Sequence, residues 1–352
     1  MVKRQYLLTV IFIFAILFLH AQTGGHSVYQ FLNLSPGPRI SALGGMPIAW
    51  KGDDPAAAYL NPSLLSSKMN GNVYFAHQYY FADISSGHFS YSCLLSKLNL
   101  NSQFGIQYVQ HGDLIQTDIY GNSIGSFKAK ENNFYIAVSR TLLDRLTIGI
   151  NLQYIYSKLD IYSSNGLALN TGINYNNPEK QFNISMVFKN AGFQLSKYNH
   201  QSEDLPFEIQ LGIAKKLKHL PLIYHITLQH LEKWDVSYDD PSISNDGVLF
   251  GEAPKNNKFE DALNNLLRHV VFGAELNFGK KENFSLRFGY NPLRSHDLSL
   301  ADYRSFSGIS AGFGIKIYKF KFDYSYAKYH LAGGTSQISL SANIFSFIQK
   351  EM

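Results

Sequence analysis

The sequence is poor in charge and almost free of cysteine. Only 16% of its 352 residues are charged, against about 25% in typical soluble domains. Because Cys93 is the single cysteine, the chain can form neither an internal disulfide nor a metal site built on several cysteines. It also lacks a cluster of Lys and Arg of the kind that binds nucleic acid, so we expect no nucleic-acid partner.

Long apolar runs are missing as well, except at the start. Lys3 and Arg4 precede an apolar stretch from Leu7 to Leu19, and Ala21 ends a fair cleavage pattern. This order is typical of a secretory signal peptide, so we interpret residues 1–21 as a leader cleaved after about Ala21. The alternative is a retained N-terminal anchor. No later run is long enough for a transmembrane helix.

What the remaining chain does contain is alternation. In Arg145–Tyr154 every second residue is apolar, and His269–Phe278 and Asn283–Tyr290 follow the same pattern. A period of two indicates a β-strand with one apolar and one polar face. About fourteen segments qualify, namely 73–82, 86–95, 102–111, 132–140, 145–157, 167–175, 182–189, 206–215, 222–230, 269–278, 283–290, 306–316, 319–328 and 335–345.

Strand length and connection length both favour a membrane barrel. Most candidates match the roughly 9–11 residues of a tilted membrane strand, whereas soluble strands are usually about 5–6 residues long. Connections after even strands are short, and the long ones follow odd strands: 112–131, 158–166, 190–205, 231–268 and 291–305. Outer-membrane barrels separate short periplasmic turns from long extracellular loops in this way. We therefore predict an all-β, antiparallel transmembrane barrel over residues 71–347, with a soluble sandwich or propeller as the alternative.

The polar strand face then lines the lumen. Fourteen strands enclose a lumen that is too wide for the side chains of the wall alone to fill. Residues 22–70 precede the first strand and are the natural plug. Within them Gly44-Gly45 predicts a turn, and Asp54 followed by Pro55 predicts the start of a short helix that Asn61-Pro62 ends. The charged residues on the inward parity, which we interpret as a solvated or plug-contacting wall, are Glu208, Glu275, Arg287, Lys319, Lys321 and Asp323.

Motifs of enzymes are missing from the sequence. There is no zincin pair of histidines and no phosphate-binding loop, and Ser310 lies between glycines in a strand without a following helix. We therefore expect no catalytic residue, no metal site and no cofactor, and we predict that the protein is not an enzyme.

The longest loop contains one organised element. In Lys258–Arg268, four large apolar residues follow the stripe of an amphipathic helix: Phe259, Leu263, Leu266 and Leu267. An exposed apolar stripe needs a cover. The helix either folds over the barrel mouth as a lid or presents these side chains to a partner.

Several segments, taken in order, resemble the PorV/PorQ family of outer-membrane proteins of the bacterial type IX secretion system, and the first of them resembles the PorQ branch most. The similarity extends from about residue 25 to about residue 345. The segments are Tyr29–Gly45, Asp53–Ala56, Tyr59–Pro62, Arg287–Asn291, Phe322–Ala327 and Gly333–Leu340. They include the plug positions Arg39, Gly44, Gly45, Asp53, Asp54, Asn61 and Pro62.

The resemblance implies a FadL-like barrel of fourteen strands with an N-terminal plug and no enzymatic activity. It implies a scaffold in the bacterial outer membrane that anchors a PorZ-like surface protein, within a cargo-attachment complex that includes PorU-like and PorV-like proteins. The alternative is a FadL-like transporter for hydrophobic small molecules. A scaffold predicts a plugged lumen, and a transporter predicts an apolar pocket beside residues 31–65.

Overall fold

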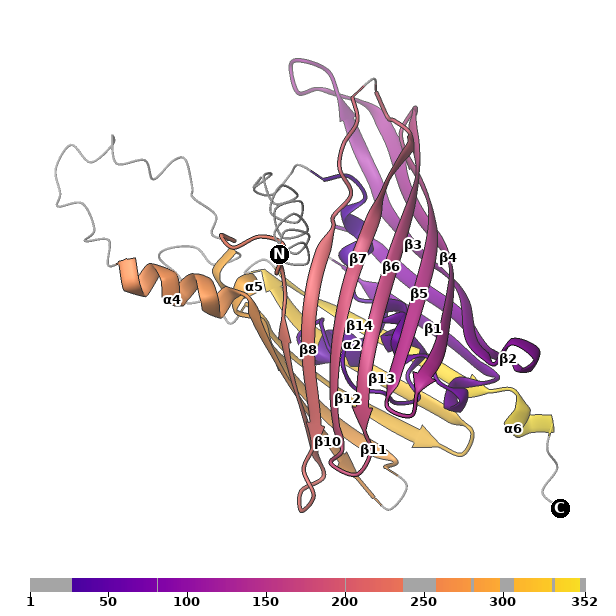
Figure 1. Cartoon of the computed structure of the whole chain (residues 1–352). Helices are drawn as coiled ribbons and strands as arrows, with labels where there is room; N and C mark the ends of the chain where they lie inside the picture. The colour runs from indigo at the N-terminus through magenta and orange to yellow at the C-terminus, as the bar shows by residue number, and fades with distance from the viewer. Residues whose placement is uncertain are drawn as a thin grey trace, which may run out of the picture.

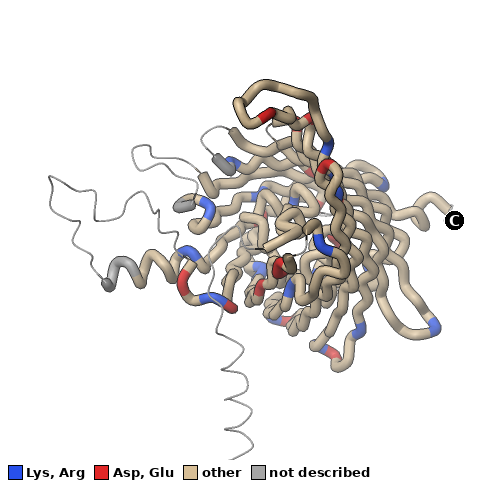
Figure 2. Tube along the Cα trace, turned by 90° about the horizontal axis from the view of Figure 1, so that it is seen from above, with Lys and Arg blue, Asp and Glu red and all other residues tan. Residues whose placement is uncertain are grey.

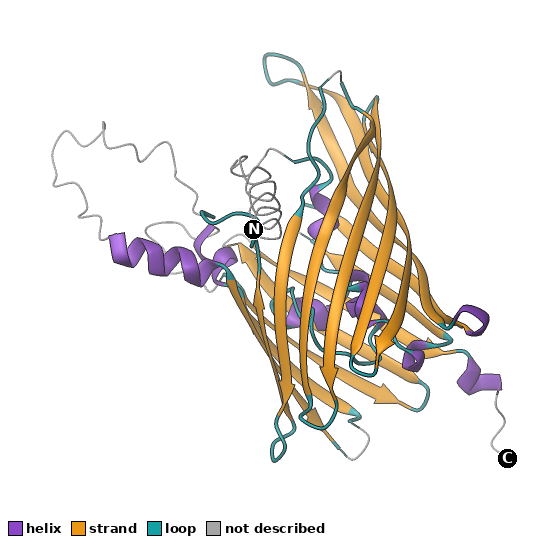
Figure 3. Cartoon of the chain, viewed as in Figure 1, coloured by secondary structure: helices purple, strands orange, loops and turns teal. Residues whose placement is uncertain are grey.

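The computed structural model describes residues 27–80, 82–199, 201–236, 258–279, 282–297, 307–330 and 333–348. Within these ranges fourteen antiparallel strands form a closed barrel, in which each strand pairs with its neighbours in sequence and β1 pairs with β14 (Figures 1 and 3). The predicted all-β barrel of about fourteen strands is therefore confirmed. The expected leader, residues 1–21, lies outside the described residues.

The strands differ widely in length. They are β1 (Asn72–Tyr79), β2 (Ser85–Leu95), β3 (Leu100–Thr117), β4 (Ser123–Leu143), β5 (Leu146–Leu159), β6 (Tyr162–Asn177), β7 (Phe182–Ser196), β8 (Glu208–Lys216), β9 (Leu222–Leu228), β10 (Val270–Phe278), β11 (Phe284–Tyr290), β12 (Ile309–Ile317), β13 (Phe320–His330) and β14 (Gly333–Asn343).

The helical elements are short and fall into two groups. Before β1 come η1 (Gln30–Asn33), α2 (Pro38–Ala42), α3 (Pro55–Leu60), η2 (Pro62–Leu64) and η3 (Ser67–Met69). Between or after strands come η4 (Ser96–Leu98), α4 (Lys258–Arg268), α5 (Pro292–Asp297) and α6 (Phe345–Ile348). No helix in the described part of the chain has both the length and the apolar character needed to span a bilayer.

The wall is polar on its inner face and apolar on its outer face. Along β5 the inward side chains of Asn151 and Gln153 are fully buried, whereas Leu152 and Tyr154 next to them are 54% and 42% exposed. The same alternation runs through the other strands. This arrangement is the inverse of a soluble protein and is typical of a barrel whose outer surface faces lipid.

The wall is much taller on one side than on the other (Figure 1). β3 and β4 have 18 and 21 residues, whereas β9 and β11 have seven each. β2 stops pairing with β3 at Gln110, but β3 and β4 stay paired up to Thr117 and Ser123.

The prediction that residues 112–131 and 158–166 form loops is therefore wrong. Most of their residues extend the strands, and only residues 118–122 and 160–161 connect them. The apolar alternation ends where lysines such as Lys128 and Lys130 begin to face outward. Backbone pairing nevertheless continues into water, because it does not depend on contact with lipid.

The strands β7 and β8 separate part of the way along. Their pairing ends at Lys189 and Glu208, although β7 continues to Ser196 with β6 as its only strand partner. Residues 197–207 connect the two strands. The N-terminal segment packs against this connection, where the Val28 N–H donates to the Asp204 carbonyl at 2.9 Å.

Residues 27–71 lie inside the barrel (Figures 1 and 2), and we call this segment the plug. Its apolar side chains are shielded from solvent, with Ile40 and Leu64 fully buried and Leu32 only 1% exposed. Short helices give the plug internal backbone hydrogen bonds, so few of its amide groups depend on the wall.

Three inward-facing glycines of the wall, which we call the receiving glycines, make room for atoms of the plug. A Cβ atom at any of them would lie 2.0–2.3 Å from a plug atom, a distance that side chains do not tolerate. The contacts are Gly149 with Pro62, Gly172 with Asn61, and Gly289 with Gly44. These close approaches fix the plug against the β5, β6 and β11 regions of the wall.

Replacing Gly149 by Ala tests the close packing of the plug against the wall. The new methyl group would meet the Pro62 carbonyl carbon at 2.3 Å, and overpacking of this kind costs about 1–3 kcal/mol. We expect the temperature at which the detergent-solubilised barrel unfolds to fall. Gly125→Ala is the matched control, since Gln116 lies at an ordinary contact distance of 3.5 Å there. Equal unfolding temperatures for both variants would contradict a close-packed plug.

Candidate functional site

A buried arginine joins the plug to the wall. Arg39 of α2 contacts Glu275 of β10 through two hydrogen bonds, at 3.0 Å from Nε and 2.6 Å from Nη2. Its Nη1 atom lies 3.3 Å from a carboxylate oxygen of Asp54, which precedes α3. One guanidinium therefore connects two parts of the plug with the barrel, through the two-pronged geometry in which arginine binds carboxylates best.

The ionic contacts continue along the inner wall. Glu275 also accepts a hydrogen bond from Arg287 of β11 at 2.7 Å, and Arg287 donates to Asp323 of β13 at 2.6 Å. The Arg287 side chain is only 1% exposed and that of Asp323 only 6% exposed. We call Arg39, Asp54, Glu275, Arg287 and Asp323 the ionic network. Figure 2 shows basic and acidic residues together inside the barrel.

Direct pairing of opposite charges is what makes this network tolerable. Removing a charge from water costs several kcal/mol, and only well-placed partners offset that cost. Glu275 lies between two guanidinium groups, and Arg287 lies between two carboxylates. The network therefore specifies one position of the plug, because any displacement would leave a buried charge without its partner.

A second ion pair lies beside the network. Lys321 of β13 approaches Asp53 at 3.7 Å, and the Asp53 side chain is 57% exposed. The charge of Lys321 lowers the pKa of Asp53, with a smaller contribution from Arg39 and against the effect of burial. The pair is a further contact between the plug and the wall, here between the segment before α3 and β13.

The plug motifs of the sequence hold the plug together locally. Asp54 caps α3 by accepting from the Ala56 N–H at 3.0 Å, as the sequence predicts. The Asn61 amide donates to the Ile48 carbonyl at 2.8 Å, and its oxygen accepts from the Ser63 N–H at 3.0 Å. Pro62 is the first residue of η2. These side chains fold the plug, whereas Arg39 attaches it to the wall.

The predicted turn at Gly44-Gly45 ends α2. Both glycines have positive φ, +83° and +92°, and the Gly45 N–H bonds back to the Ile40 carbonyl at 2.9 Å. Ser310 of β12 accepts from the Gly44 N–H at 3.2 Å and donates to the Ala42 carbonyl at 3.1 Å. The hydroxyl of Ser310 is thus used to hold the plug, a role that its flanking glycines did not reveal.

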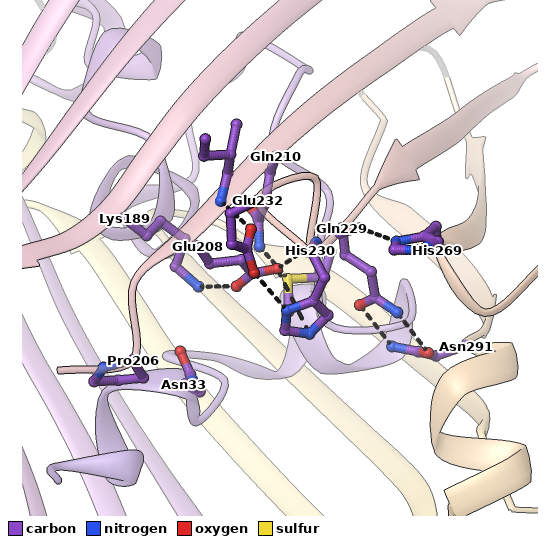
Figure 4. Close-up of polar contacts among 12 residues, drawn as sticks. Asn33, Lys189, Pro206, Glu208, Gln210, Gln229, His230, Glu232, His269 and Asn291 are labelled. Atoms are coloured by element: carbon purple, nitrogen blue, oxygen red, sulfur yellow. Dashed lines mark hydrogen bonds and ion pairs between the residues drawn. The ribbon is translucent and has the colours of Figure 1, made fainter. Parts of the chain in front are cut away.

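A further polar cluster lies where β7 and β8 separate (Figure 4). Lys189 and Glu208 form an ion pair at 3.4 Å, and each side chain is 3% exposed. Glu208 also accepts from the His230 N–H at 3.4 Å, and the His230 ring lies 3.2 Å from Glu232. Burial lowers the pKa of His230, but Glu232 and Glu208 together outweigh it and raise the pKa above its ordinary value.

A cavity of about 110 Å³ opens beside the ionic network. Its lining includes Arg39, Asp53 and Lys321, and also Glu282 and Lys316 near the short β10–β11 and β12–β13 connections. It therefore lies at the end of the barrel where the short turns are. Charged walls suit water and ions, whereas pockets for hydrophobic molecules are mostly apolar.

No cluster of three or more His, Cys, Asp or Glu that could hold a metal occurs in the described ranges. The buried His88 instead packs among aromatic rings, stacked on Tyr135 with centroids 5.6 Å apart. Its Nε2 atom lies 2.8 Å from the Tyr135 hydroxyl. These contacts are those of a packed core histidine.

The helix predicted over Lys258–Arg268 is present as α4. It extends away from the barrel and does not lie across the mouth (Figures 1 and 2). Leu263, Leu266 and Leu267 are 45%, 46% and 42% exposed. Phe259 lies in the helix, but its side chain is outside the described part of the structure. Binding of a partner by this stripe stays a prediction.

The prediction that six charged wall residues face the lumen was correct for most of them. Glu208, Glu275, Arg287 and Asp323 are buried, and Lys321 faces the plug. Lys319 is the exception, because it lies in the turn after β12 with its amine 4.8 Å from the centre of the Tyr318 ring. The sequence did not reveal the ion pairs or the receiving glycines. Glycines at inward positions of the predicted strands could have indicated where the plug approaches the wall.

No protein-family model matches the sequence, and neither does any curated protein. Solved structures show a clear likeness in fold. The toluene transporter TodX of Pseudomonas putida is 11% identical with a TM-score of 0.50, and the match covers 88% of this chain and 97% of TodX. A TodX mutant described as a monoaromatic hydrocarbon channel gives a TM-score of 0.53 at 11% identity, with 88% and 99% of the two chains covered.

A FadL homologue of Pseudomonas aeruginosa is also similar, at 8% identity and a TM-score of 0.50, with 91% of this chain and 100% of the homologue covered. The chain therefore has the FadL-like fold, an antiparallel barrel of fourteen strands with a segment before β1. This is the fold of bacterial outer-membrane proteins. At such low identity the likeness extends to the fold alone.

Neutralising Glu275 tests the ionic network. Glu275→Gln leaves Arg39 and Arg287 without their shared carboxylate, and breaking a buried pair costs about 3–5 kcal/mol. We expect a large drop in the urea concentration at which the purified barrel unfolds. Glu282→Gln is the control, because its pair with Lys216 is partly exposed and exposed pairs contribute only about 0–1 kcal/mol. If the two variants unfold together, the network does not hold the plug.

The His230 cluster predicts a pH dependence of stability. A pKa raised by folding stabilises the protein below the unfolded value of about 6.5, and this contribution is lost as the pH rises through the folded value. We expect the unfolding temperature of the wild type to fall as the pH rises above about 6.5, and His230→Gln to reduce this fall. His219→Gln, at an exposed turn position, should leave the profile unchanged. A wild-type profile retained in His230→Gln would refute the assignment.

Proposed function

We propose that this protein is a plugged barrel of the bacterial outer membrane that serves as a membrane anchor for a surface protein. The observation that supports this most is the plug itself. Residues 27–71 fill the lumen and are fastened by the ionic network and by three receiving glycines. A lumen closed by buried ion pairs suits a rigid scaffold better than an open path.

The resemblance to the PorV/PorQ family gives the proposal its finer form. The partner would be a PorZ-like surface protein, held within the type IX attachment complex that also contains PorU-like and PorV-like proteins. In this role the barrel performs no chemistry and needs no cofactor. Its contribution is to hold the bound surface protein in place, because a folded barrel fixes its extracellular surfaces relative to the membrane.

The projecting hairpin of β3 and β4 offers a surface for such a partner. Its tip exposes Ile119 and Tyr120, which are 92% and 84% accessible. The tip is held in shape by Asp118, which accepts from the N–H groups of Tyr120 and Asn122 at 2.9 and 2.8 Å. Beyond Lys130 the hairpin adds about seven residues, or roughly 23 Å of strand, so lipid does not reach the tip. Exposed apolar residues in water favour protein binding.

Affinity purification from detergent-solubilised outer membranes tests the anchor. We expect the tagged wild type to retain a PorZ-like surface protein. Ile119→Ser combined with Tyr120→Ser should weaken retention by about 30-fold or more if the tip is a hot spot. Leu98→Ser, a 62% exposed residue at the opposite end of the barrel, is the control. A wild-type barrel that retains no surface protein would contradict the anchor, and unchanged retention by the tip variant would exclude the tip alone.

Transport of hydrophobic small molecules is the second candidate. It is favoured by the likeness in fold to barrels named as a toluene transporter and a monoaromatic hydrocarbon channel. The charged cavity argues against it, because its walls suit hydrophobic ligands poorly. Toluene uptake by cells that depends on this protein, and that changes when Asn61 and Pro62 are altered, would favour the transporter over the anchor.

A further inference from the structure

The helix α4 leaves the barrel at the outer end of its shortest wall. β9, β10 and β11 have seven, nine and seven residues, which is at or below the roughly 9–11 residues that a tilted strand needs to cross a bilayer. No wall therefore rises above the membrane at this point. α4 ends at Arg268, and β10 begins at Val270. The helix thus joins the barrel at the level of the extracellular surface of the membrane.

From this junction α4 runs outward, away from the barrel axis. The side view and the view from above agree in this (Figures 1 and 2). The space beside the outer wall of a membrane barrel is occupied by lipid. A helix that leaves the wall sideways at the membrane surface is therefore placed over the outer leaflet, not over the lumen.

The helix has one apolar face, and among the described residues that face is exposed. Leu263, Leu266 and Leu267 are between 42% and 46% exposed. Asn264 lies about 100° around the helix from Leu263 by the helical spacing, and its polar side chain is exposed. A short helix with leucines on one side and polar residues on the other has the pattern of a helix that lies in a membrane interface.

The base of α4 is held firmly, so its direction is part of the fold. The Asn265 amide donates to the Trp234 carbonyl at 2.6 Å, and its oxygen accepts from the Val236 N–H at 3.2 Å. The Trp234 ring stacks on the ring of His269, with centroids 6.1 Å apart. His269 is 4% exposed and connects the helix with β10.

The apolar face is followed closely in the chain by the lipid-facing surface of the barrel. Leu267 precedes Val270 by three residues, and Phe272, the next outward residue of β10, is 42% exposed. Trp234, beside the base of the helix, is 72% exposed. Tryptophan is enriched at membrane interfaces, where its ring contacts the acyl chains and its N–H reaches the headgroups.

We propose that α4 and Trp234 lie in the outer leaflet beside the barrel, with Leu263, Leu266 and Leu267 in contact with lipid acyl chains. The exposed leucines, the sideways exit of α4 from the short wall and the adjoining lipid-facing residues of β10 carry this assignment. The contact anchors α4, which is the last part of the β9–β10 connection, to the membrane. It is independent of the proposed anchor function, which depends on the plug and on the β3–β4 hairpin.

Tryptophan fluorescence can test this directly, because the chain has only two tryptophans, Trp50 and Trp234. Both are replaced by Phe, and a single indole is introduced by Leu266→Trp or, as the matched control, by Asn264→Trp. Each full-length variant is reconstituted into phosphatidylcholine vesicles with and without bromine on the acyl chains. Resistance of the barrel to unfolding in dodecyl sulfate without heating shows that each variant is folded.

We expect the bromine-labelled chains to quench the Leu266→Trp indole about twofold or more, and the Asn264→Trp indole by less than about a fifth, since interfacial helices bury one face about 5–10 Å deep. In the Trp50→Phe variant, Trp234 should be quenched as well. Equal weak quenching at both helix positions, with water-like emission, would overturn the proposal and leave the face for a protein partner. Emission typical of a buried indole without bromine quenching would also overturn it, because the face would then pack on protein.

Discussion

The closed ring of backbone hydrogen bonds is the constraint on which the rest of this structure depends. Inside a bilayer every amide group has to find its partner within the protein, so a sheet can cross only if it has no free edge. Here β1 and β14 pair from Asn72 with Asn343 to Tyr79 with Ser336 and so complete the ring. Closure and the pleat together place alternate side chains inside, and in this chain those inward positions are mostly polar and the outward positions mostly apolar.

A polar lumen in turn determines what can fill it. The plug brings a mixed surface, with apolar side chains packed among themselves and Arg39 directed at Glu275. The ion pairs hold the plug in place because each buried charge of the network lies next to at least one charge of opposite sign. The receiving glycines add shape, since they admit plug atoms where a methyl group would not fit.

The sequence was informative about the wall and much less so about the site. Alternation revealed the strands and their inward parity, because burial against lipid follows the pleat directly. It did not reveal the outer part of the β3–β4 hairpin, since Lys128 and Lys130 face water while the backbone stays paired. Asp54 could be predicted as a cap because capping is local. The Arg39–Glu275 pair joins residues 236 positions apart, so no short pattern could identify it.

The order of the chain has a consequence for how this molecule is assembled. The plug precedes every strand in synthesis, yet it ends up enclosed by a seam between the first and the last strand. Once that seam has formed, the packed wall leaves no route by which the segment could be threaded in afterwards. Folding must therefore enclose the plug as the sheet curls around it, which makes the many distant contacts of the lumen a late and slow step.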